Sequence, residues 1–291
     1  MRGVASARAA ISVVNALPLG IGSAIGIEWP ARTTARLDQD RPRRGRASIE
    51  PASSVTPLVR ASAQAALDRF DATGTGRVRL VVRSTIPVAR GLKSSSAVST
   101  SVALATARAL GHEPPPVEVA RIAAEVGRGT GVSATGAFDD ALAGLVPGGV
   151  VTDNRRDRPL RGLDLGPDLA VALWVPDHPH PRAPRLQARF RREPTLARRA
   201  ADAALAGDWV RAMELNSALV ERAMGYRYER LHDVVRRAGA VASGVSGLGP
   251  ALAALSPQGR LRSVLNALPR EGRRRSVRLF SAPEVAGGGP R

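Results

Sequence analysis

Residues 91–97 (Gly-Leu-Lys-Ser-Ser-Ser-Ala) follow a predicted strand and open a predicted helix. The amino end of a helix presents unpaired N–H groups and a partial positive charge, and both favour anions. The glycine lets the backbone approach a ligand closely, the serine hydroxyls can donate hydrogen bonds or bind magnesium, and Lys93 adds a mobile cation. The segment therefore predicts a phosphate-binding loop, although it lacks the GxxxxGK[ST] spacing of a Walker A loop. The alternative is a serine-rich helix cap that binds no ligand.

Lys93 is the only lysine of the chain, and the other 42 of its 43 basic side chains are arginine. Lysine is a compact point charge on a flexible stem, whereas arginine is a bulky planar fork. All the remaining basic positions carry arginine, so the lysine at position 93 indicates a specific need for lysine there. The alternative is that a single surface lysine falls here by chance.

Asp139 and Asp140 are adjacent carboxylates in segment 135–140 (Thr-Gly-Ala-Phe-Asp-Asp), at the start of a predicted helix. Acidic residues in a first helical turn can be merely solvated, because the helix end favours negative charge. Beside a glycine-containing loop, however, they are candidates for a catalytic base and a metal ligand. Phosphoryl transfer to an alcohol needs a group that orients or deprotonates the hydroxyl and a magnesium ion that neutralises the phosphates.

Segment 244–250 (Gly-Val-Ser-Gly-Leu-Gly-Pro) carries three glycines and a serine before an apolar run that we expect to be helical. Such a loop can wrap a phosphate or support the first loop. Flexible loops of this composition are common, so the segment alone is a weak signal.

The elements around these segments predict an α+β protein. Residues 77–84 alternate charged and apolar side chains, which is typical of a half-buried strand, and Pro87 follows its end. Other segments predict strands at 8–14, 23–28, 32–37, 169–175 and 276–280, and helices at 97–110, 117–126, 195–206, 209–224 and 229–238. The mixture has no strict strand–helix alternation.

Composition narrows the class of protein. The chain has 291 residues, 44% of them hydrophobic, which suffices for one large domain or two lobes. Cysteine is absent, which excludes disulfides and thiolate metal sites, and no apolar run approaches the roughly 20 residues of a membrane span. We expect a cytoplasmic protein. The net charge of +18 fits nucleic acid or small anionic substrates, but only 3% of residues are aromatic, which disfavours base stacking.

Together and in this order, the three segments resemble the GHMP kinase superfamily. Its phosphate loop reads approximately Pro-x-x-x-Gly-Leu-Gly-Ser-Ser-Ala-Ala, and residues 87–97 match it, except that Lys93 replaces a glycine. The lysine-containing loop is similar to that of the archaeal-type shikimate kinase branch. Further matches to that branch are Thr-Gly-Ala-Phe-Asp-Asp-Ala at 135–141, Gly-Gly at 148–149, Thr-Asp-Asn at 152–154, Asn-Ala at 15–16 and the glycine-rich run 20–26.

The resemblance implies a two-lobed α+β fold of mixed sheets with helices packed on them. An N-terminal lobe, 1–155, would carry the phosphate loop and the catalytic aspartate, and a C-terminal lobe, 156–291, the glycine-rich loop. The implied reaction transfers the ATP γ-phosphate to the 3-hydroxyl of shikimate, on the route to chorismate and the aromatic amino acids, with ATP and Mg²⁺ as cofactors. We expect no membrane partner, and the sequence leaves the oligomeric state open.

The resemblance also implies roles for single residues. Asp140 orients or deprotonates the acceptor hydroxyl, Asp139 supports it or faces solvent, and Lys93 stabilises the developing charge. Ser95, with Ser94 or Ser96 as second choice, and Glu125 are the expected metal ligands, and Asn15 contacts the acceptor or caps a turn. The residues expected to bind the nucleotide are Pro87, Arg90, Gly91, Leu92, Lys93, Ser94, Ser95, Ser96, Ala97, Gly244, Ser246, Gly247 and Gly249.

Three other functions stay open. A sister kinase for homoserine or mevalonate would use the same fold, but the lysine-containing loop and the Phe-Asp-Asp motif argue against it. A basic protein that binds RNA or DNA would show salt-dependent binding and no ATP turnover. A catalytically silent family member is disfavoured by the presence of Lys93, Ser95 and Asp140.

Overall fold

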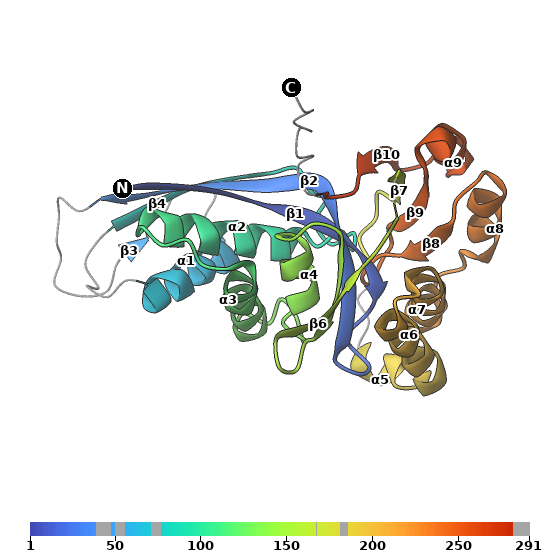
Figure 1. Cartoon of the computed structure of the whole chain (residues 1–291), viewed down its shortest axis with the longest axis horizontal. Coiled ribbons are helices and arrows are strands. Elements are labelled where there is room, and N and C mark those ends of the chain that lie inside the picture. Colours follow the sequence, from blue (N-terminus) through green and yellow to red (C-terminus); the bar gives the residue numbers. More distant parts are fainter. Residues whose placement is uncertain (39–47, 50–55, 71–76, 167, 181–185, 282–291) are drawn as a thin grey trace, which may run out of the picture.

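The strands form two sheets with helices packed against them, which confirms the expected α+β class (Figure 1). The computed structural model describes the chain except for residues 39–47, 50–55, 71–76, 167, 181–185 and 282–291. No helix of the described residues has the length and apolar character needed to cross a bilayer.

The first sheet is built around the long strand β2 (Ile21–Asp38), which pairs antiparallel with its neighbours on both sides. Its order is β3-β4-β2-β5-β6, with β1 also paired to β2; the other strands are β1 (Arg2–Val14), β3 (Ser48–Ile49), β4 (Arg77–Ser84), β5 (Gly149–Asp153) and β6 (Arg158–Leu163). The segments 23–28 and 32–37 are strands as predicted, but they belong to one continuous strand rather than to two. Pro30 pairs with Arg8 directly beside a register shift, so the irregularity accommodates the proline without ending the strand.

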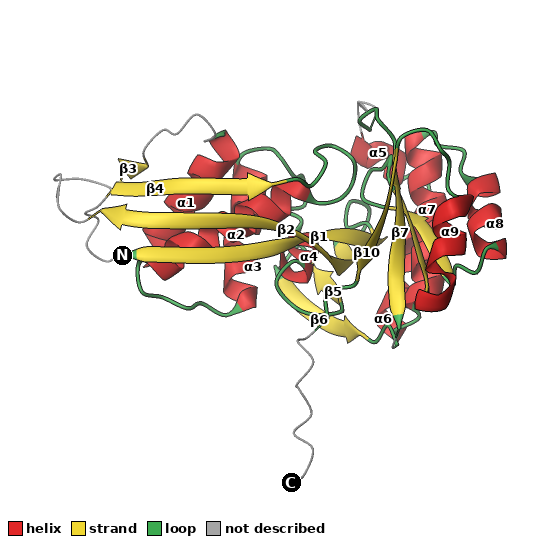
Figure 2. Cartoon of the chain, turned by 90° about the horizontal axis from the view of Figure 1, so that it is seen from above, coloured by secondary structure: helices red, strands yellow, loops and turns green. Residues whose placement is uncertain are grey.

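Helices α1 (Pro57–Phe70), α2 (Ser94–Ala109), α3 (Pro116–Gly129) and α4 (Phe138–Ala143) lie on one side of this sheet (Figures 1 and 2). The small side chains of α2 allow its backbone to approach β1 closely. A Cβ atom added at Gly3 would lie 2.1 Å from the carbonyl oxygen of Ala105. This close packing fixes the position of α2 and thus of its amino end.

The second sheet has the order β10-β7-β9-β8. Its strands are β7 (Leu169–Val175), β8 (Ala242–Val245), β9 (Leu252–Pro257) and β10 (Arg273–Arg278), and the helices of this part are α5 (Leu186–Phe190), α6 (Pro194–Ala206), α7 (Trp209–Met224), α8 (Glu229–Arg237), the 3₁₀ turn η1 (Gln258–Arg260) and α9 (Leu261–Ala267). The strands at 77–84 and 169–175 and the helix at 209–224 have the predicted bounds.

The apolar run after Pro250 is the strand β9, so the predicted helix was wrong. β9 pairs with β7 on one side and with β8 on the other, and its residues before Pro257 are buried. A short continuous apolar run fits a buried strand as well as a helix, and here the pairing partners decided the outcome.

One hydrophobic cluster joins the two sheets. It includes Ile11 of β1 and Ile25 of β2 from the first sheet, and Leu173 of β7 and Leu255 of β9 from the second. Leu92 and Ala97 of the phosphate loop belong to this cluster, whereas Phe138 and Val245 of the other two segments belong to two further clusters. The division into lobes 1–155 and 156–291 stays a prediction, and β6 of the first sheet begins beyond it, at Arg158.

Candidate active site

The phosphate loop turns sharply into α2 through two left-handed residues. Gly91 has φ of 83° and Lys93, the N-cap residue, has φ of 61°. No side chain of the described residues caps this helix, although serines follow directly. The alternative of a serine cap is therefore not seen at this helix, and the amino end of α2 remains available to an anion.

The third glycine segment packs directly on the first. The Ser246 hydroxyl donates a hydrogen bond to the carbonyl oxygen of Gly91 at 2.7 Å, and a Cβ atom at Gly91 would lie 1.9 Å from the Ser246 carbonyl oxygen. Ser12 of β1 holds the third segment, because its N–H donates to Ser246 Oγ and its hydroxyl accepts from the Gly247 N–H at 3.0 Å. The sequence offered no signal for Ser12, a small polar residue within a strand.

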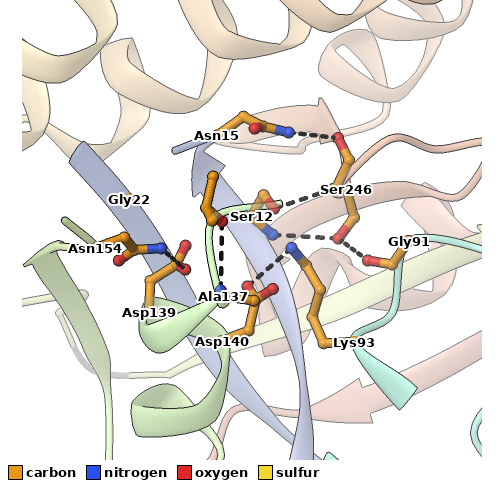
Figure 3. Close-up of polar contacts among 12 residues, drawn as sticks. Ser12, Asn15, Gly22, Gly91, Lys93, Ala137, Asp139, Asp140, Asn154 and Ser246 are labelled. Carbon is orange, nitrogen blue, oxygen red and sulfur yellow. Dashed lines mark hydrogen bonds and ion pairs between the residues drawn. The ribbon is translucent and has the colours of Figure 1, made fainter. Parts of the chain in front are cut away.

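Lys93 and Asp140 form an ion pair at the centre of the site (Figure 3). The distance from Nζ to Oδ1 is 2.8 Å, and the two side chains are only 11% and 10% exposed. The structure thus brings together the single lysine and one of the paired aspartates, which are far apart in the sequence. A lysine ammonium that faces both a carboxylate and a helix amino end is suited to a bound phosphate.

Asp139 is buried on the other side of this ion pair (Figure 3). Its Oδ1 accepts a hydrogen bond from Asn154 Nδ2 at 2.7 Å, and a Cβ atom at Gly22 would lie 2.6 Å from its Oδ2. Burial, followed by the nearby charge of Asp140, raises the pKa of Asp139 to about 7. The sequence gave Asn154 and Gly22 no role, although Asn154 belongs to the Thr-Asp-Asn segment.

Several predicted nucleotide-binding side chains are engaged in supporting the loop instead. Arg90 donates to the carbonyl oxygens of Val88, Pro176 and Asp177. The Ser94 hydroxyl donates to the Ile86 carbonyl oxygen at 3.3 Å, whereas Ser95 and Ser96 are half-buried. Three further residues expected to bind the nucleotide have buried or half-buried apolar side chains, so they can contribute only backbone groups or packing: Pro87, Leu92 and Ala97.

Asn15 contacts one of the loops of the site, whereas no contact with the site is seen for Glu125 among the described residues. The Asn15 amide accepts from the Leu17 N–H and donates to the Gly247 carbonyl oxygen, so it caps a turn against the glycine-rich loop. Glu125 lies on an exposed side of α3. Its role as metal ligand and the contact of Asn15 with the acceptor stay predictions.

The donor set fits a magnesium ion that arrives with a nucleotide. Within the described residues no three His, Cys, Asp or Glu side chains gather as a metal site. Mg²⁺ usually keeps several waters and is bound by one or two protein groups plus substrate phosphates. The half-buried Ser95 at the uncapped amino end of α2 suits that arrangement.

Comparisons with known proteins agree with this geometry. The model of the GHMP kinases N terminal domain matches residues 58–148, and that of the GHMP kinases C terminal domain matches residues 199–274. The shikimate kinase of Methanothrix thermoacetophila is 38% identical over 255 residues, which cover 88% of this chain and 85% of that protein. The shikimate kinase of Methanosarcina acetivorans is 33% identical, over 91% of this chain and 88% of that protein. The chain belongs to the GHMP kinase family.

The crystal structure of the Methanococcus jannaschii mevalonate kinase matches with a TM-score of 0.72 at 12% identity. The match covers 97% of this chain and 99% of that one, which confirms the expected GHMP kinase fold. As a GHMP kinase, the chain is an ATP-dependent phosphotransferase that acts on a small molecule. Lys93 distinguishes its phosphate loop, because this side chain occupies a left-handed position that usually favours glycine.

Proposed function

We propose that this GHMP kinase transfers the γ-phosphoryl group of ATP to the 3-hydroxyl group of shikimate, in the cytoplasm and with Mg²⁺ bound. The observation that carries the proposal is the buried Lys93–Asp140 ion pair beside the uncapped amino end of α2. It joins a carboxylate for the acceptor to a cation for the phosphates. The names of the relatives supply the identity of the acceptor.

The nucleotide phosphates lie against the amino end of α2. Backbone N–H groups of residues 91–96 donate to the phosphate oxygens, and the Ser246 loop holds Gly91 in place from the other side. The Ser95 hydroxyl would hold Mg²⁺, which supplies positive charge to the phosphates when it is bound. Lys93 adds a second cation from within the protein.

Asp140 receives the proton of the acceptor hydroxyl. In the reaction the acceptor oxygen forms a bond to the γ-phosphorus, the bond between that phosphorus and the bridging oxygen breaks, and ADP leaves. Lys93 keeps Asp140 in position and stabilises the negative charge of the transferring group. Asp139, with its pKa near 7, carries a proton part of the time at neutral pH, which limits the negative charge beside Asp140.

The test is ADP release with MgATP and, separately, shikimate, homoserine or mevalonate. We expect turnover with shikimate alone, and a loss of at least about 100-fold in kcat for Asp140→Asn and for Lys93→Ala, since each removes a general base or a charge donor. Asp164→Asn is the matched control, because Asp164 is an exposed aspartate in the β6–β7 connection.

Each other result has a definite meaning. Turnover with homoserine or mevalonate in place of shikimate would contradict the substrate assignment and leave the phosphotransfer. Full activity in Asp140→Asn would contradict its role as base. Salt-sensitive binding of nucleic acid without any ATP turnover would overturn the proposal as a whole.

A further inference from the structure

We propose that Arg155 binds the carboxylate of the acceptor and makes the site selective for anionic alcohols, an inference that rests on the proposed kinase function. Shikimate carries a carboxylate on one ring carbon and the reacting hydroxyl on another carbon of the same ring. A site that places the hydroxyl at Asp140 therefore needs a cation a short distance away on the side opposite the phosphates.

Arg155 differs from the two arginines that follow it. Arg156 and Arg158 both form ion pairs with Asp153, at 3.1 and 3.6 Å. Arg155 contacts Asp153 only through its backbone N–H, which donates a hydrogen bond to Asp153 Oδ1. Among the described residues no carboxylate pairs with the Arg155 side chain, which is exposed.

The Arg155 side chain lies over the turn that opens β2. A Cβ atom at Gly20 would lie 2.6 Å from Arg155 Nε and 2.7 Å from its Cγ, so the arginine side chain lies directly against this glycine. Two residues further on, Asp139 lies against Gly22 in the same way. Two positions along a strand are about 7 Å apart, so Arg155 and Asp139 rest on neighbouring parts of one backbone segment.

Asn154 fixes this arrangement between them. Its N–H donates to the Gly20 carbonyl oxygen at 2.8 Å, and its side chain donates to Asp139. Figure 3 shows the order across the site: Asn154, Asp139, Asp140, Lys93 and Gly91. Arg155, the residue after Asn154, is thus joined to the end of the site that lies away from the phosphate loop.

Three other basic groups of this region are already engaged with protein partners. Lys93 pairs with Asp140, Arg90 donates to three carbonyl oxygens, and Arg128 pairs with Asp157. Arg155 retains a planar guanidinium that can donate two parallel hydrogen bonds to a carboxylate. An acceptor that spans Asp140 and Arg155 brings its own negative charge to a guanidinium for which the described residues supply no carboxylate.

The test compares shikimate with its methyl ester, in which the carboxylate charge is lost. In the wild type we expect kcat/KM for shikimate to exceed that for the ester by about 10- to 100-fold, the range for a hydrogen-bonded charged group. Arg155→Gln should lower kcat/KM for shikimate to near the ester value, through KM, and leave the ester and the KM for ATP unchanged. Arg155→Lys should restore part of the preference, and Arg156→Gln is the matched control.

Different outcomes refute different statements. If Arg155→Gln lowers turnover of shikimate and ester equally, Arg155 only stabilises the loop and the inference is wrong. If Arg155→Gln keeps the wild-type preference for shikimate, another cation binds the carboxylate. If the wild type does not phosphorylate shikimate, the proposed function fails and this assignment fails with it.

Discussion

Replacing Lys93 with alanine should destabilise the folded chain even in the absence of ligands. Asp140 would be left buried without its partner at 2.8 Å, and removing one member of a buried ion pair costs about 3 to 5 kcal/mol. The side chains are 11% and 10% exposed, so water reaches them slightly and we expect the lower end, about 3 kcal/mol.

The backbone conformation of Lys93 makes a second contribution to stability, which is unfavourable to the folded state. Its φ of 61° is left-handed, which costs a residue with a Cβ atom about 1 kcal/mol or more relative to glycine. Lys93→Gly removes the same charge but also this strain. We therefore expect Lys93→Gly to be about 1 kcal/mol more stable than Lys93→Ala, the reverse of the order found inside helices.

Urea unfolding of the ligand-free chain measures both effects. Lys93→Ala/Asp140→Ala should lose less stability than Lys93→Ala alone, because the double variant leaves no unpaired charge. Wild-type stability in Lys93→Ala would refute the buried ion pair. Equal stability of Lys93→Ala and Lys93→Gly would refute the argument from the left-handed conformation.

Two further predictions follow from the same site. Gly91→Ala should lower Tm far more than Gly111→Ala: both glycines have φ above 80°, but a Cβ atom at Gly91 would lie 1.9 Å from the Ser246 carbonyl oxygen and one at Gly111 meets nothing within 4 Å. Similar losses of Tm in the two variants would contradict the close approach of the loops. The raised pKa of Asp139 means that the folded state binds more protons than the unfolded state between about pH 4 and 7, so this group makes stability fall as pH rises through that window. Asp139→Asn should remove this slope from the free energy of unfolding against pH, and an unchanged slope would assign it to other groups.

Residue type and spacing predicted which segments of the chain lie close together. The three glycine-containing segments lie together as the order of motifs implied, and Lys93 contacts Asp140. The pairing itself could not be predicted. The two residues come from different helices, and only the packing of α2 and α4 against the first sheet brings them within 2.8 Å.

Other residues of the site received no individual role from the sequence. Ser12, Gly22 and Asn154 are small residues whose types suit many positions in strands and turns, and their roles depend on neighbours that are distant in sequence. The run after Pro250 was misassigned for a similar reason. Alanine and leucine favour helices locally, but pairing of β9 with β7 and β8 outweighed that preference.

The phosphate loop depends on the second half of the chain for its shape. Ser246 donates to Gly91, the Ala251 N–H donates to the Arg90 carbonyl oxygen at 3.2 Å, and the Arg90 guanidinium donates to residues that follow β7. These contacts come from β7 and from the β8–β9 connection, so the loop is held from outside its own strand and helix. The segment 91–97 therefore supplies the groups that we propose for the phosphates, whereas the second sheet helps to determine where these groups are held. Because Leu92 and Ala97 belong to the core between the sheets, we expect a change in that core to alter the position of the loop without changing the motif itself.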